Sequence, residues 1–99
     1  SQFDAEPTWR ALLAAYYARQ QQTEQLWSPR LTSVDGVPVE QLSAVHGKLM
    51  AYEFLKVDIA NRTEGLVYQV TPWGREALLP AEKRQTAPEW QLATDSIAA

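Results

Sequence analysis

The hydrophobic period of the chain changes near residue 55, and this change limits the folds that it can form. In LKVDIA (55–60), Leu, Val and Ile occupy every second position, which is typical of a half-buried β-strand. A similar run, LVYQVT (66–71), follows the polar loop NRTEG (61–65). Two strand-like runs joined by five residues that include a glycine predict a β-hairpin.

The second predicted strand leads directly into a helix. Thr71 is a good N-cap, and Pro72 suits the first helical position because the N–H that proline lacks would have no helical partner there. This junction returns the hairpin to the body of the domain in few residues. We therefore expect helix 72–79 to be structural, with Trp73 closing the core.

Two helices are predicted before the first glycine of the chain. Apolar side chains recur at close to helical spacing in residues 8–27, and Thr8 is a candidate N-cap. The dipeptide Ser28-Pro29 then marks a new helix start, because Ser caps well and Pro suits the position after it. It predicts a two-turn helix over 29–35, which the following Gly ends.

A third helix is predicted over residues 38–53. Its inward face is formed by Leu42, Val45, His46, Leu49 and Tyr52. The fold class is therefore α+β and mostly helical: three helices, a hairpin and a short fourth helix in residues 1–79, then a C-terminal tail, 80–99. The core is expected to include Trp9, Trp27 and Trp73.

Composition narrows the class of protein. A chain of 99 residues, 45% of them hydrophobic, indicates one folded domain. The absence of cysteine excludes disulfides, thiolate metal sites and a Cys nucleophile, and it fits a reducing compartment. No apolar run approaches the roughly 18 residues that indicate a membrane span. The start, SQFDAEP, lacks signal-peptide features and a Met, so we expect a cytoplasmic protein, either an excised domain or a processed chain.

A short motif joins the predicted hairpin to the last helix. The strand ends in Y-x-V-T, and after two residues the helix continues as G-x-x-A-L; these positions are Tyr68, Val70, Thr71, Gly74, Ala77 and Leu78. With the element order, this motif resembles winged helix-turn-helix domains of bacterial transcription regulators of the MarR and PadR types. FLKV (54–57) also matches their step into the hairpin, although Glu53 stands where those families usually have Gly. The likeness covers about residues 9–79 and brings no cofactor or effector motif.

The resemblance implies that helix 38–53 lies in the major groove of double-stranded DNA, with the chain acting as a homodimer or as part of a larger regulatory or replication protein. A turn of 100° per residue directs Glu40, Ala44, Gly47 and Ala51 outward, with Gln41, Ser43 and Lys48 on the flanks. Only Gln41 and Lys48 are of the types that match purine edges well. The candidate DNA contacts are Arg30, Glu40, Gln41, Ser43, Ala44, Lys48 and Arg62.

Two of these cations lie outside the predicted recognition helix. Arg62, in the wing loop, can enter the minor groove or bind phosphate; alternatively it is a solvated residue that pairs weakly with Glu64. Arg30 can reach backbone phosphate or have a structural role.

The bare centre of the helix face supports a second interpretation, a protein-interaction or oligomerisation module that binds no DNA. Gly47 and Ala51 permit close approach by another backbone, whether DNA or protein, although Gly47 can also be a tolerated defect that costs about 1 kcal/mol. Trp90, in the tail, can pack on a dimer partner or on the first helix of its own domain. The net charge of −3 adds weight to this alternative.

Catalytic and metal-binding patterns are not evident in the sequence. His46, the single histidine, lies on the inward face and is expected to be a buried residue with one hydrogen bond, although a pH-switch role stays open. Asp and Glu are scattered without the spacing of a metal site or an acid–base pair. The sequence therefore predicts a non-enzymatic protein without a cofactor or a metal.

Overall fold

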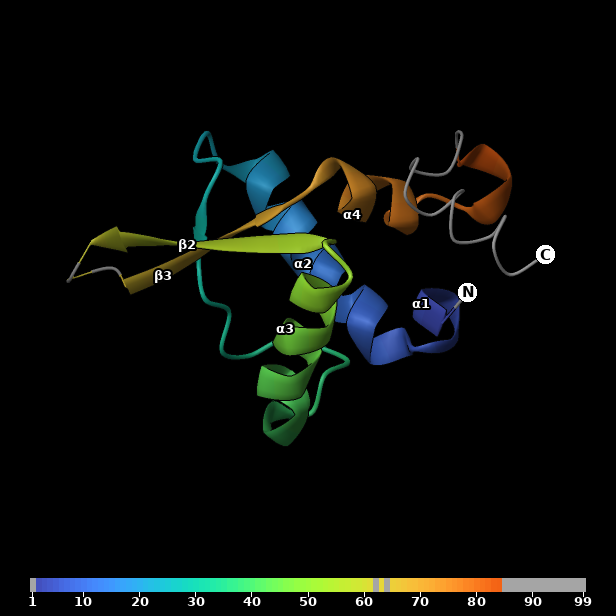
Figure 1. Ribbon diagram of the computed structural model, residues 1–99, viewed down its shortest axis with the longest axis horizontal. Coiled ribbons are helices and arrows are strands. Elements are labelled where there is room, and N and C mark those ends of the chain that lie inside the picture. Colours follow the sequence, from blue (N-terminus) through green and yellow to red (C-terminus); the bar gives the residue numbers. More distant parts are fainter. Residues whose placement is uncertain (1, 62, 64, 85–99) are drawn as a thin grey trace.

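The computed structural model describes residues 2–61, 63 and 65–84 of the chain, and in this part the fold is α+β (Figure 1). Its elements are α1 (Gln2–Ala5), α2 (Pro7–Gln22), β1 (Ser28–Pro29), the 3-10 turn η1 (Val39–Gln41), α3 (Leu42–Ala51), β2 (Leu55–Asn61), β3 (Gly65–Val70), α4 (Pro72–Leu78) and the 3-10 turn η2 (Ala81–Lys83). The predicted α+β class and the predicted hairpin are confirmed, but the sheet has a third strand that was not predicted, and it occupies the start of the predicted second helix.

The three described strands form one antiparallel sheet in the order β1-β3-β2. Within the hairpin, Leu55 lies opposite Val70 and Val57 lies opposite Tyr68, while Ser28 of β1 pairs with Tyr68 from the other side. The short strand β1 and the longer strand β2 therefore form the two edges of this sheet. The far part of the hairpin projects away from the helices (Figure 1).

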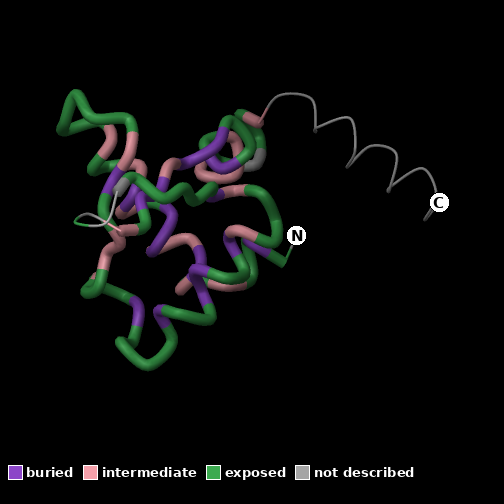
Figure 2. The backbone as a smooth tube through the Cα atoms, turned by 60° about the vertical axis from the view of Figure 1, so that its left-hand side comes forward, coloured by how far each residue is buried: buried purple, intermediate pink, exposed green. Residues whose placement is uncertain are grey.

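The core lies between one face of the sheet and the helices α2 and α3. Buried segments lie toward the inside of the described chain, and exposed ones form most of its outer turns (Figure 2). Leu55, Tyr68 and Val70 supply the sheet side of the core. From the helices come Trp9, Leu12, Leu13, Tyr16, Leu42, Val45 and Leu49. The prediction that Leu42, Val45, His46 and Leu49 point inward is confirmed, since all four are buried.

The helix predicted over residues 29–35 is wrong. Ser28 and Pro29 form the edge strand β1, and the Ser28 hydroxyl donates to the Pro29 carbonyl (2.8 Å) instead of capping a helix. Further along, the Leu31 N–H donates to the Tyr16 hydroxyl (2.9 Å), and an isolated bridge between Val34 and Val37 closes the turn. Pairing with the sheet and with Tyr16 thus replaces the hydrogen bonds that a two-turn helix would form.

The first long helix is shorter than predicted. It begins at Pro7 rather than after a Thr8 cap and ends at Gln22, where the extended Thr23 donates its N–H and its hydroxyl to the Arg19 carbonyl (both 3.1 Å). Trp27 therefore lies outside the helix, is only partly buried, and is not part of the core cluster in which it was predicted.

Two further aromatic predictions were wrong. Trp73 is 37% exposed and does not close the core, because the buried residue of α4 is Gly74. Tyr52 lies just beyond the end of α3, is exposed, and packs its ring on that of Trp9, with ring centroids 5.5 Å apart.

The predicted junction between β3 and α4 is confirmed and is a close packing point. The Thr71 hydroxyl accepts from the Gly74 N–H (3.0 Å) and donates to the Glu53 carbonyl (2.6 Å). The Thr71 N–H donates to the Phe54 carbonyl (3.1 Å). A Cβ atom at Gly74 would collide with that same carbonyl oxygen and would lie 2.8 Å from Cγ1 of Val70. Only glycine lets α4 pack this closely on the connection between α3 and β2.

The end of α3 is a Schellman motif with a glutamate at its left-handed position. The Phe54 N–H donates to the Leu49 carbonyl (2.9 Å), and the Glu53 N–H donates to the Met50 carbonyl (3.0 Å). Glu53 has φ of 63°, a conformation that glycine adopts without steric cost. Glu53 therefore occupies a left-handed helix end, a position that glycine suits better than any residue with a side chain.

We predict opposite effects for one substitution at two glycines. Gly74→Ala should lower the free energy of unfolding by about 1–3 kcal/mol, because the added methyl group overpacks a backbone contact. Gly47→Ala should raise it by about 1 kcal/mol, because its Cβ would meet no atom outside its own helix within 4 Å and Ala favours helix. Urea unfolding measures both. Equal signs for the two variants would contradict this packing.

We also predict that Glu53→Gly stabilises the fold. A side chain in the left-handed region costs about 1–2 kcal/mol, and the larger chain entropy of unfolded Gly offsets part of this gain. We expect a net increase of about 0.5–1 kcal/mol in the free energy of unfolding. Glu53→Ala is the matched control, since it removes the charge but keeps the Cβ, and it should give no such increase.

Candidate functional site

The outward face of α3 carries the residues that the sequence predicted for it. Ser43, Ala44, Gly47, Lys48 and Ala51 are exposed, and Glu40 and Gln41 are exposed on the preceding turn η1. Among these seven residues, Lys48 is the single cation and Glu40 has the opposite charge. The structure therefore brings the predicted helix contacts together on one surface, and that surface has little net charge.

Arg30 does not extend this surface. Its Nη1 donates to the Tyr68 hydroxyl (2.6 Å), and its guanidinium lies 5.7 Å from the centre of the Tyr68 ring. These contacts hold the half-buried side chain against β3, which fits the structural role that the sequence left open. Two other predicted site residues, Arg62 and Trp90, lie outside the described residues.

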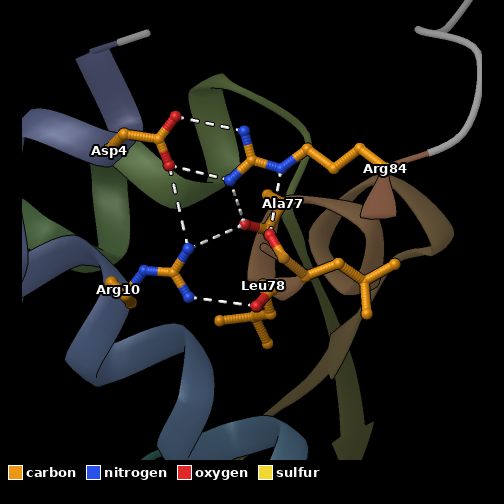
Figure 3. Close-up of polar contacts among 6 residues, drawn as sticks. Asp4, Arg10, Ala77, Leu78 and Arg84 are labelled. Atoms are coloured by element: carbon orange, nitrogen blue, oxygen red, sulfur yellow. Dashed lines mark hydrogen bonds and ion pairs between the residues drawn. The ribbon is translucent and has the colours of Figure 1, made fainter. Parts of the chain in front are cut away.

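Arg10 of α2 and Arg84, just after η2, form a polar cluster with Asp4 of α1. Arg84 binds both carboxylate oxygens of Asp4 (2.7 and 3.1 Å), and Arg10 lies 3.7 Å from the same carboxylate (Figure 3). Arg10 also donates to the carbonyls of Ala77 (3.2 Å) and Leu78 (3.0 Å) at the end of α4. These charges hold the helix ends together and compensate the last carbonyls of α4.

Lys56 of β2 also has an aromatic partner. Its Nζ lies 5.4 Å from the centre of the Trp27 ring, on the face of the sheet opposite the core. The sequence pattern had placed Trp27 in the core, so this contact was not predicted.

His46 belongs to a chain of buried hydrogen bonds. The Leu31 N–H donates to the Tyr16 hydroxyl (2.9 Å). Nδ1 of His46 lies 2.8 Å from the Leu42 carbonyl, which can only accept, so Nδ1 carries a hydrogen. Burial favours the neutral ring, in which Nε2 has no hydrogen and accepts from the Tyr16 hydroxyl (2.7 Å). The predicted buried histidine is confirmed, with two hydrogen bonds in place of one.

Burial shifts the pKa values of both His46 and Tyr16. It lowers the pKa of His46 below its ordinary value of 6.5, although the hydrogen bond to Leu42 opposes the change. It raises the pKa of Tyr16 to about 12. Both shifts favour the neutral forms on which the hydrogen-bond chain depends.

The outer part of the hairpin exposes a stripe of apolar side chains that the sequence had assigned to a half-buried strand. Val57 is 41% and Ile59 73% exposed on β2, and Leu66, opposite Ile59 on β3, is exposed as well. The helices cover Leu55, which precedes Val57 on the same face of β2, but they do not reach the exposed stripe. The alternating pattern identified the strand and its face, but it could not show how far along the strand the helices extend.

A groove of about 460 Å³ lies beside the exposed edge of β2. It is lined by Met50, Glu53, Leu55, Lys56, Val57, Thr71, Pro72 and Trp73. Its apolar part comes from the end of α3, the start of β2 and the start of α4. No pattern in the sequence indicates this groove, because its walls meet only in the folded chain.

Comparison of the chain with protein-family models, with curated proteins and with solved structures gave no match in any of the three. Within the described ranges, no three His, Cys, Asp or Glu residues are grouped so that they could hold a metal ion. Over the same ranges, no helix has the length and apolar character that crossing a membrane requires.

We predict that the stability of the fold falls on both sides of neutral pH because of the buried hydrogen bond between Tyr16 and His46. Below pH 6.5 the unfolded His46 takes up a proton that the folded residue resists, so the free energy of unfolding decreases as the pH falls, until the lowered folded pKa is reached. Between pH 10 and about 12 the unfolded Tyr16 ionises first, so stability decreases as the pH rises.

Urea midpoints measured from about pH 5 to 7, and above pH 10, test this prediction. His46→Gln should remove the pH dependence near 6.5, and Tyr16→Phe should remove the part of the alkaline loss that Tyr16 contributes. An unchanged slope below pH 6.5 in the His46 variant would assign that slope to other groups.

Proposed function

We propose that the chain is a non-catalytic winged-helix variant that acts by binding protein through the exposed edge of its sheet. The observation on which this rests is the position of Val57 and Ile59. They are apolar, they are exposed, and they lie on the edge strand β2. An exposed strand edge is a template for another strand, and apolar surface beside it adds affinity.

The charge distribution supports protein over DNA as the partner. DNA binding depends strongly on Lys and Arg side chains that displace counterions from several phosphates. On the α3 surface Lys48 is offset by Glu40, and Arg30 is bound to Tyr68. The chain as a whole has a net charge of −3.

Duplex DNA is the second candidate, because of the arrangement of the elements. The hairpin follows α3 directly, and the outward face of α3 is formed by small residues. No atom outside its own helix lies within 4 Å of the position that a Cβ at Gly47 would take, so a phosphate backbone could approach there. The order of these elements is like that of a winged helix, and such an analogy supports a fold class more than it supports a DNA contact.

A salt titration separates the two candidates. We expect a fluorescently labelled mixed-sequence duplex to show no saturable change in anisotropy with the full chain, even at about 50 mM salt, where phosphate contacts are strong. Lys48→Ala and the remote control Lys83→Ala should behave like the unchanged protein. Tight binding that weakens steeply by about 200 mM salt, and that Lys48→Ala alone reduces, would establish the DNA candidate instead.

A further inference from the structure

We propose that β2 pairs antiparallel with β2 of a second copy of the chain, about a twofold axis at Val57. The two three-stranded sheets would then form one continuous sheet across the dimer. This inference rests on the proposed protein-binding function and names its partner. Three independent features of the structure support it: the direction of the edge hydrogen-bonding groups, the charges on β2, and the groove beside it.

The ladder between β2 and β3 fixes which backbone groups of β2 point outward. The Phe54 carbonyl accepts from the Thr71 N–H, so Phe54 faces β3. Backbone groups alternate in direction along a strand, so Lys56 and Asp58 also face β3. The N–H and carbonyl groups of Leu55, Val57 and Ile59 must therefore point away from the sheet.

Two side-chain contacts agree with this alternation. The Val70 N–H, opposite Leu55, donates to Oε1 of Gln20 (2.6 Å) rather than to β2. The Ile59 N–H donates to its neighbour, the Asp58 carboxylate (2.8 Å), as an outward-pointing amide would. The outer edge of β2 thus presents alternating donors and acceptors to a further strand.

The charges on β2 select one register for a second copy. With Val57 on the twofold axis, Lys56 lies opposite Asp58 of the second copy, and this attractive pair occurs twice. A shift of two residues in one direction places Lys56 opposite Lys56, and a shift in the other places Asp58 opposite Asp58. Like charges directly opposite each other are destabilising, so the self-complementary register is favoured.

The same register fills the groove. It places Ile59 of the second copy beside Leu55, on the face of the sheet where Leu55 and Val57 line the groove with Met50 and Trp73. Ile59 is 73% exposed in the single chain. Pairing would bury one Ile59 side chain from each copy and would cover the partly exposed Trp73 ring.

Charged residues on an edge strand also protect proteins against unwanted pairing. Protection against self-pairing is best served by like charges, whereas Lys56 and Asp58 have opposite signs and lie two residues apart. In the dimer the Asp58 carboxylate would leave the Ile59 N–H for the lysine of the second copy, and a backbone carbonyl would take its place.

Sedimentation velocity of the full chain over a range of concentrations tests the pairing. We expect a concentration-dependent dimer that Lys56→Asp or Asp58→Lys weakens about tenfold or more, because each single variant places like charges opposite each other. The double variant K56D/D58K should restore self-association. An equimolar mixture of the two single variants should form a heterodimer.

The apolar contact has a matched control. Ile59→Asp should abolish the dimer, whereas Val39→Asp, at a position that is 71% exposed but lies on the turn before α3, should leave it intact. Circular dichroism confirms that each variant is folded. Hydrogen exchange at the Val57 amide should slow as the concentration of the unchanged protein rises.

The outcomes distinguish this inference from the function on which it rests. A dimer that persists in both single charge variants would overturn the pairing of β2 with a second copy, while the proposed binding of a different protein at this edge would stand. A chain that stays monomeric at every concentration would overturn the inference, and salt-sensitive duplex binding by that monomer would overturn the proposed function as well.

Discussion

The contact between Thr71 and the end of α3 is the constraint on which the rest of the fold depends. Thr71 bonds to Glu53 and Phe54 while it caps α4, so three elements meet at one residue. The close approach of Gly74 to the Phe54 carbonyl then fixes the position of α4. Because the same point anchors the start of β2 and the end of β3, it also sets the direction in which the hairpin leaves the domain.

A buried polar chain replaces the helix that is missing between β1 and α3. Tyr16 holds the backbone of Leu31 on one side and His46 on the other, and Arg30 rests on the Tyr68 ring. A segment without regular structure leaves backbone groups that need partners, and side chains from α2 and β3 supply some of them. The positioning of α3 therefore depends on neutral His46 and Tyr16 as well as on apolar packing.

The sequence predicted the elements whose evidence is local, and it missed those decided by distant contacts. The inward face of α3, the hairpin and the Thr71 cap follow from period and turn chemistry, and all are present. The Ser28-Pro29 start was misleading, because the same two residues suit an edge strand once β3 lies beside them. The prediction that Trp73 closes the core was wrong for a similar reason. Glycine at the next position brings α4 too close to its neighbours for a large inward side chain. The outward face of α3 was predicted correctly, but the attachment of Arg30 to Tyr68 depends on residues 38 positions apart.

The exposed stripe on the hairpin follows from a mismatch in length between sheet and helices. On the face of β2 that the helices meet, Leu55 is buried, and exposure then rises from Val57 to Ile59. Solvent-exposed Val57 and Ile59 gain little burial within one chain, so this part of the apolar pattern adds little to the stability of the monomer. An apolar face that continues past the helices, next to charges of opposite sign on the same edge, is explained more simply by a second surface that covers it. The features that leave the strand exposed in one chain are then the features that make it complementary to another.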